Sequence, residues 1–174
     1  MILNSDIILT HPLWERADNE LCNKNGLAIF NRLVDVYILA CSIGIKEDET
    51  LSSSDEQSQG QKTIGRNTYM SLTNTDLRDL LDFMLQNAII NSETLNLSVD
   101  DRLKLAFDPD FSLNKFSPAS FLTGFANYGI DQIFKHIDSQ SSLVALDELY
   151  KYFSSLEESK YEDILKNITL GSIT

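Results

Sequence analysis

Apolar residues are densest in residues 26–45, and their spacing predicts a helix that is covered on nearly every side. Positions three or four apart are apolar, and neighbouring apolar residues widen this stripe until little of the circumference is polar. The residues of this pattern are Leu27, Phe30, Val34, Tyr37, Ile38 and Cys41, widened by Ile29, Leu33, Val36 and Ala40. Gly44 offers a left-handed C-cap. We predict an all-α fold, a single compact multi-helix domain around this central helix.

The same spacing predicts further helices downstream. Thr75 is a good N-cap for a helix over residues 75–90, and Ser98 for one over 99–107. Ser117 and Pro118 open a helix that continues to residue 137. Two last helices are expected over residues 141–156 and 160–170. The expected buried positions of the first two are Leu77, Leu80, Leu81, Met84, Leu85 and Ala88, then Leu103, Ala106 and Phe107.

Two glycines, Gly124 and Gly129, interrupt the helix that opens at Pro118. A glycine inside a helix costs roughly 1 kcal/mol relative to alanine. Their presence therefore indicates either the close approach of another helix or a kink over residues 127–129. The natural neighbour is the central helix. If that helix is buried as predicted, Phe30→Ala should cost roughly 3 to 5 kcal/mol of stability.

Two segments do not fit the helical pattern. Residues 1–14 are short and apolar with Pro12 interrupting them, which predicts an extended N-terminal arm packed on the domain or, in part, on another subunit. Residues 46–62 are rich in Ser, Gln and acids, and predict a mobile acidic surface loop, most simply a tolerated insertion. Residues 63–70 are expected to form a short strand or coil that packs Ile64, Tyr69 and Met70.

Composition narrows the class of protein. The 174 residues suit one domain over 1–174, and 43% apolar residues can supply its core. A net charge of -12 argues against direct binding of nucleic acid and favours a basic partner surface. Cys22 and Cys41 make no disulfide framework, which favours a reducing compartment. The first fifteen residues resemble neither a signal peptide nor a membrane span, so we expect a cytoplasmic protein without membrane contact.

Candidate catalytic and ligand-binding residues are few. His11 and His136 have no partner in any motif, and each is best interpreted as a surface or capping histidine. Asp108-Pro109-Asp110 lacks the further ligands of a calcium loop and predicts a helix-terminating turn. Carboxylates recur every three residues on one helix and are interpreted as a solvated face: Asp76, Asp79 and Asp82. No phosphate-binding loop or four-ligand zinc pattern occurs. We therefore expect no catalysis, no cofactor and no metal.

Two blocks of sequence resemble a known family. Phe30, Asp35 and Gly44 form the first block, and the second comprises Phe125, Ala126, Asn127, Gly129 and Ile130. Residues 26–137 are thereby similar to the small proteins associated with bacterial DNA phosphorothioation systems. The chain departs from that pattern at Phe125 and Tyr128, and in the acidic loop and the C-terminal helices. The resemblance implies an accessory component of an anti-phage or anti-plasmid defence operon that works beside a larger ATPase or nuclease subunit. An acidic, all-helical small subunit with an apolar arm suits a clamp-like adaptor, for which an SMC-type ATPase is one candidate partner. No catalytic residues carry over.

Apolar segments outside the central helix are the candidate partner-binding surfaces. The arm and the segment over residues 143–170 can both bury apolar area on another subunit. The residues proposed for this contact are Ile7, Ile8, Leu9, Trp14, Leu146, Tyr150 and Phe153.

Two alternatives to a role as an accessory subunit remain. The charge of -12 fits a DNA-mimicking inhibitor, although the acids are dispersed, and a small enzyme with an unrecognised site would need a polar pocket at His136 or at the carboxylates of residues 76–82.

Overall fold

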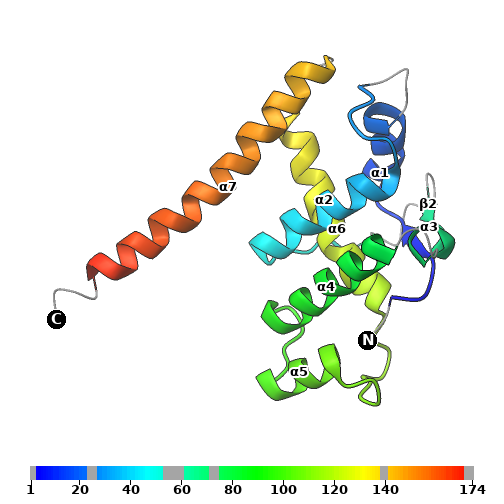
Figure 1. Ribbon diagram of the computed structural model, residues 1–174, viewed down its shortest axis with the longest axis vertical. Helices are drawn as coiled ribbons and strands as arrows, with labels where there is room; N and C mark the ends of the chain where they lie inside the picture. The colour runs from blue at the N-terminus through cyan, green and yellow to red at the C-terminus, as the bar shows by residue number, and fades with distance from the viewer. Residues whose placement is uncertain (1–2, 23–26, 53–60, 71–74, 138–140, 171–174) are drawn as a thin grey trace. The chain divides into compact units, whose positions relative to one another are not determined.

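A computed structural model of the chain is mostly helical, which confirms the predicted all-α class, with one small sheet added (Figure 1). It describes residues 3–22, 27–52, 61–70, 75–137 and 141–170, with no side-chain description at 75 or over 157–170. The chain divides into two compact units, Met1–Gln132 and Ile133–Thr174. The prediction of a single domain over 1–174 stays a prediction. The elements are β1 Ile7–Leu9, α1 Leu13–Arg16, η1 Ala17–Cys22, α2 Leu33–Glu47, β2 Lys62–Ile64, α3 Arg66–Met70, α4 Thr75–Asn91, α5 Val99–Phe107, α6 Pro118–His136 and α7 Ser142–Leu170.

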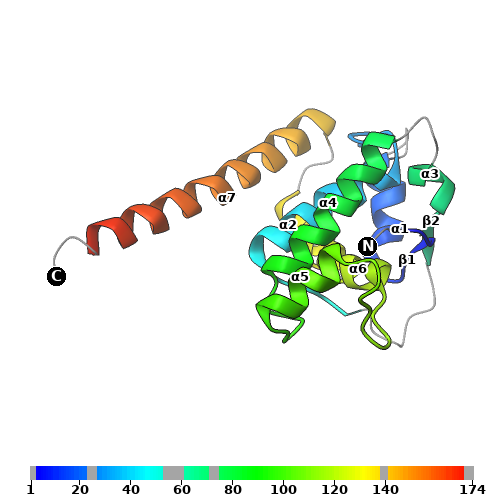
Figure 2. The ribbon, with the colours of Figure 1, turned by 60° about the horizontal axis from the view of Figure 1, so that its bottom comes forward.

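The first unit begins with the predicted extended arm. Strand β1 pairs antiparallel with β2, with Ile7 opposite Ile64 (Figure 2). Ile7 and Leu9 are buried while Ile8 between them is half exposed, as expected where successive side chains of a strand point to opposite faces. The arm then turns into the short helix α1 and a π-helical turn, η1, which the sequence pattern did not predict.

The central helix is present, but both of its predicted ends are wrong. Helix α2 begins at Leu33, so Phe30 precedes it and is only half-buried. The loss expected for Phe30→Ala assumed a fully buried residue within the helix. Phe30 is neither fully buried nor part of the helix, so that assumption is wrong. At the other end, Asp48 rather than Gly44 adopts the left-handed cap conformation, with φ 53°. The backbone N–H of Asp48 donates to the carbonyl of Ile45, and that of Glu49 donates to the carbonyl of Gly44. The sequence also predicts Asn25 or Asn23 as the N-cap of this helix, but its N-cap is Arg32, and Asn23 and Asn25 lie outside the described residues.

The predicted close approach of α2 and α6 is confirmed. A Cβ placed on Gly129 of α6 would lie 2.7 Å from the Cα of Ala40, and one on Gly44 of α2 would lie 2.8 Å from the Cα of Phe125. Each helix therefore contributes one glycine to the crossing, where the backbones touch without intervening side chains. Ala40 precedes Gly44 by one turn and Phe125 precedes Gly129 by one turn, so the two helices run antiparallel at this contact.

A buried polar group also joins segments far apart in the sequence. The indole Nε1 of Trp14 donates to Oδ1 of Asn127 at 2.8 Å, and the amide nitrogen of Asn127 donates to the carbonyl of Leu51 at 3.2 Å. Trp14 has no exposed surface and Asn127 is 2% exposed. The single side chain of Asn127 therefore hydrogen-bonds to both Trp14 of α1 and Leu51, which follows α2. Its own buried polar atoms are paired in this way, as buried polar groups usually are.

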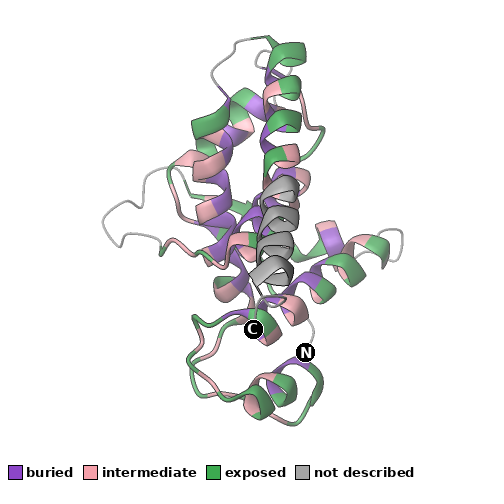
Figure 3. Cartoon of the chain, turned by 90° about the vertical axis from the view of Figure 1, so that its left-hand side faces the viewer, coloured by how far each residue is buried: buried purple, intermediate pink, exposed green. Residues whose placement is uncertain are grey.

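Helices α4 and α5 of the first unit pack against each other. Ser98 caps α5 as predicted, since its side chain accepts from the N–H of Asp101. Buried and exposed positions alternate along the helices (Figure 3), but three residues expected to face inward do not. Leu80, Leu103 and Phe107 are exposed by 42%, 42% and 58%. The predictions for these three residues are therefore wrong.

The second unit contains the end of α6 and the long helix α7. The break predicted between residues 156 and 160 is absent, because α7 is continuous from Ser142 to Leu170. Ala145, Leu149 and Tyr152 are its buried positions among the described side chains. The ring of His136 stacks on that of Tyr152, with centroids 3.9 Å apart and an interplanar angle of 14°.

The loop predicted over residues 46–62 is partly replaced by regular structure. Helix α2 takes in Lys46 and Glu47, and β2 begins at Lys62. Residues 53–60, at the centre of the prediction, lie outside the described residues.

Candidate functional site

Large apolar side chains are exposed on two adjacent helices of the first unit. We call this set the α4–α5 surface: Leu80 and Phe83 on α4, and Val99, Leu103 and Phe107 on α5. Phe83 and Val99 are each 62% exposed. Scattered apolar residues are normal on a protein surface, but five large ones on two packed helices suit contact with another molecule.

The geometry of α5 places three of these residues in one row. Val99, Leu103 and Phe107 are four residues apart, which is close to one helical turn, and Leu105 and Ala106 face the core instead. The helix is held at its start by the Ser98 cap and at its middle by Arg102, whose Nη1 donates to the carbonyl of Ser92 at 3.0 Å. The exposed row therefore lies on a fixed element rather than on a loop.

A cavity of about 470 Å³ begins where α5 ends. Asp108, the C-cap of α5 and the neighbour of Phe107, is one of its lining residues. The complete lining is Asn4, Asp108, Pro109, Phe111, Ser112, Leu113, Phe116 and Pro118. The backbone N–H of Asp110 donates to Asp108 at 2.9 Å, so Asp108-Pro109-Asp110 forms the helix-terminating turn that was predicted. Aromatic and proline walls with one carboxylate suit an apolar group that carries a positive charge.

The charge around the α4–α5 surface is negative. Residues 75–110 contain eight acidic and three basic residues. Two of the three cations are engaged locally, Arg78 with Asp79 at 2.9 Å and Arg102 with the carbonyl of Ser92. Asp76 and Asp100 are exposed. The surface therefore combines apolar side chains with an excess of carboxylates.

The structure places the predicted partner-binding residues in two different environments. In the arm, Ile7, Leu9 and Trp14 have no exposed surface, so they already contribute to the protein's own core, while Ile8 is 50% exposed. On α7, Leu146 is 53% and Tyr150 is 71% exposed, and Phe153 is half-buried. Leu143, which was not among the candidates, is 81% exposed. Partner binding by these residues stays a prediction, and the exposed ones are those able to make such a contact directly.

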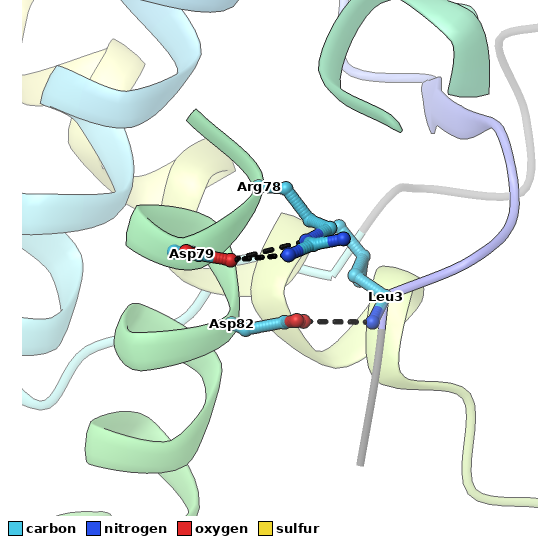
Figure 4. A network of polar contacts seen from close by, with 4 residues as sticks. All are labelled: Leu3, Arg78, Asp79 and Asp82. Carbon is cyan, nitrogen blue, oxygen red and sulfur yellow. Dashed lines mark hydrogen bonds and ion pairs between the residues drawn. The ribbon is translucent and has the colours of Figure 1, made fainter. Parts of the chain in front are cut away.

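The predicted carboxylate face of α4 is divided by the structure. Asp76 and Asp79 are exposed, whereas Asp82 is half-buried and its Oδ1 accepts from the backbone N–H of Leu3 at 2.9 Å (Figure 4). Burial raises the pKa of Asp82, and the bond from Leu3 opposes that shift. Asp82 thus fastens the N-terminal segment to α4.

The two histidines have different surroundings. Nδ1 of His11 accepts from the backbone N–H of Leu13 at 3.4 Å, and burial lowers the pKa of His11 although nearby Asp131 opposes this. His136 stacks on Tyr152 in the second unit. Among the described residues, no group of three or more His, Cys, Asp or Glu side chains could hold a metal ion.

A smaller polar cavity of about 260 Å³ lies beside the start of α2. Its lining is Asp18, Asn19, Cys22, Asn31, Arg32 and Leu33. The guanidinium of Arg32 is paired with Asp35, with the shortest contact at 2.6 Å, and Asp18 is paired with Lys62 at 2.7 Å. Burial and the carboxylate of Asp18 raise the pKa of Cys22 to about 11. Each charged residue of this cavity is therefore paired with a residue outside its lining, and its thiol is weakly acidic.

Comparison with known proteins gives no family for the chain: no family model, no curated protein and no solved structure matches it. None of the helices in the described part of the chain is both long enough and apolar enough to span a bilayer. The resemblance to phosphorothioation-associated proteins thus stays a prediction.

Sequence reasoning missed the α4–α5 surface because it assigned one inward face to each helix. A usable signal was present in α5, where Leu105 lies on nearly the opposite side of the helix from the row of Val99, Leu103 and Phe107. A nine-residue helix with apolar residues on two sides has more apolar surface than one core contact covers.

Proposed function

We propose that this protein is a non-catalytic accessory subunit that binds a larger protein subunit. The observation that carries this proposal is the exposure of large apolar side chains on well-formed helices in both units. They are Phe83, Val99 and Phe107 in the first unit, and Leu143, Leu146 and Tyr150 in the second. Exposed apolar and aromatic residues on helices are typical of surfaces that become buried in a complex.

The biological setting that we propose is a cytoplasmic bacterial defence complex acting against phage or plasmids. The resemblance of residues 26–137 to phosphorothioation-associated proteins supports this setting. The proposed partner is the larger ATPase or nuclease subunit of the same operon, with an SMC-type ATPase as one candidate. Because the chain carries a net charge of -12, a protein partner suits it better than direct contact with nucleic acid.

A DNA-mimicking inhibitor is less well supported. Such a protein presents carboxylates in place of phosphates along one face, whereas the carboxylates near α4 and α5 are interspersed with exposed apolar residues such as Phe83 and Val99. Apolar groups among the charges favour a protein contact.

The test is to purify the tagged full-length protein together with the products of its neighbouring genes. We expect a stable complex with one larger subunit. The double variant Leu146→Ser/Tyr150→Ser should reduce the yield of that subunit, and Ser142→Ala, an exposed change on the same helix, should not. A monomer that remains separate from all neighbouring gene products would contradict the proposal.

A further inference from the structure

We propose that the α4–α5 surface and the cavity at the end of α5 form a docking site for a basic amphipathic helix of the partner subunit. This inference rests on the proposed function and makes it more specific, since it names the surface and the chemistry of the bound segment. Three observations support it: the arrangement of the exposed apolar residues, the sign of the surrounding charge, and the lining of the cavity.

The apolar residues form a pattern that a second helix can match. The row on α5, namely Val99, Leu103 and Phe107, is exposed throughout and is supported by α4, which presents Leu80 and Phe83 to solvent. An amphipathic helix binds such a surface with its own apolar residues at positions separated by three, four and seven. The partner segment therefore needs one apolar face.

The charge selects a basic partner over the other possible occupants. Eight acidic residues against three basic ones in residues 75–110 repel a nucleic acid. A second copy of the chain would bring the same negative surface and a net charge of -12. A segment with Lys or Arg beside its apolar face would instead meet exposed carboxylates such as Asp76 and Asp100.

The cavity suits one of those basic side chains. It lies at the C-terminal end of α5, and Asp108 supplies a carboxylate there. Phe111, Leu113 and Phe116 supply apolar walls. A Lys or Arg side chain has an apolar stem and a cationic end, so it can use both kinds of contact.

The first experiment measures the binding of a synthetic peptide to the full-length protein. The probe is a fluorescein-labelled leucine–lysine peptide that forms an amphipathic helix, and its control is a leucine–glutamate peptide with the same leucine positions. Fluorescence anisotropy should show saturable binding of the lysine peptide and much weaker binding of the glutamate peptide. Absence of saturable binding, or equal binding of both peptides, would overturn the proposal.

Variants then locate the binding site. Leu103→Ser/Phe107→Ser should weaken binding of the lysine peptide at least about tenfold, and Asp108→Asn should weaken it several-fold. Asn67→Ser is the control, because Asn67 is exposed on α3 of the same unit and lies outside every proposed partner surface, so this variant should bind the lysine peptide with wild-type affinity. Equal affinity of Leu103→Ser/Phe107→Ser and the wild type would overturn the proposal. The proposal would also be overturned if the wild type formed a dimer and Leu103→Ser/Phe107→Ser abolished that dimer.

Purification with the neighbouring gene products separates the two proposals. If a larger subunit co-purifies and Leu103→Ser/Phe107→Ser lowers its yield, both proposals are supported. If the subunit co-purifies equally well with this variant, the docking site is refuted while the accessory role stands. If no subunit co-purifies with the wild type, the accessory role itself fails.

Discussion

Gly129 of α6 lies directly against the backbone of Ala40 in α2, so that even a methyl group on Gly129 would overlap the Cα and carbonyl of Ala40. The contact is backbone against backbone, and neither segment is at the end of its helix. Backbone is less able to move aside than the end of a flexible side chain. The position of α6 on α2 therefore depends on the absence of a side chain at residue 129.

The first prediction is that Gly129→Ala destabilises the protein by about 1 to 3 kcal/mol or more, because the added methyl group forces the two helices apart. Gly124→Ala is the matched control in the same helix. A Cβ there would meet Thr50 at 3.5 Å, which is an ordinary contact, so the better helix propensity of alanine should leave stability unchanged or raise it by up to about 1 kcal/mol. Urea unfolding compares both variants with the wild type. Equal losses of unfolding free energy in the two variants would contradict the close backbone contact between α2 and α6 at Gly129.

A second prediction concerns the bond between Trp14 and Asn127. Asn127→Ala leaves the buried indole N–H of Trp14 and the carbonyl of Leu51 without this partner, which should cost about 1 to 3 kcal/mol. Trp14 is the only tryptophan of the chain, so its fluorescence reports unfolding directly. Asn114→Ala, at an exposed position, should have little effect. A wild-type unfolding midpoint for Asn127→Ala would show that this hydrogen bond is unimportant for stability.

The third prediction is a pH dependence that originates from Asp82. Its folded-state pKa lies above its ordinary value of 3.8, mainly because of burial, so the folded protein holds this proton more tightly than the unfolded chain does. The contribution of Asp82 to stability is therefore greatest below pH 3.8 and declines as the pH rises through the folded-state pKa. Relative to Asp82→Asn, the wild type should lose stability as the pH rises from about 3.8 through the folded-state pKa.

The measurement for Asp82 is urea unfolding of both proteins across that pH range. Asp76→Asn changes an exposed carboxylate on the same helix and serves as the control. The stability difference between the wild type and Asp82→Asn should vary with pH more than the difference for the control. A constant difference would show that Asp82 titrates equally in both states.

The fourth prediction is that the two thiols react at different rates. With a pKa of about 11, Cys22 is mostly protonated at about pH 8 and should react with an aromatic disulfide reagent on the order of 100-fold more slowly than an unfolded thiol. Cys41 has no exposed surface, and burial raises the pKa of its thiol, so it should react only after unfolding. Cys22→Ser should remove the slow native phase. Rapid reaction of both thiols in the native protein would contradict the raised pKa of Cys22 and the burial of Cys41.

The sequence predicted the glycine contact because its cause is local. A glycine inside a helix carries a cost in any surroundings, and Gly129 therefore indicated that another helix approaches closely. The same reasoning misassigned Gly44, since a glycine near the end of an apolar run fits a cap as well as a contact. Only the position of Phe125 opposite Gly44 distinguishes the two possibilities, and that position depends on the tertiary structure.

The exposed surface could not be predicted in the same way. Leu103 and Phe107 have the apolar character and helical spacing of core residues, and their exposure depends on how many neighbours cover α5. Periodicity gives the faces of a helix but not which of them is covered. The predicted arm shows the opposite case, where residues proposed for partner contact, such as Leu9 and Trp14, are buried by the first unit itself.

The hydrogen bonds of Asn127 also bear on how the protein is synthesised. Trp14 lies 113 residues before Asn127, and Leu51 lies 76 residues before it. On the ribosome, α1 and α2 are made long before the helix that completes their buried contacts. Until α6 emerges, the apolar residues of α2 and the indole of Trp14 have no finished core to enter. The nascent chain must therefore pass through a long interval in which its most apolar helix is available to chaperones.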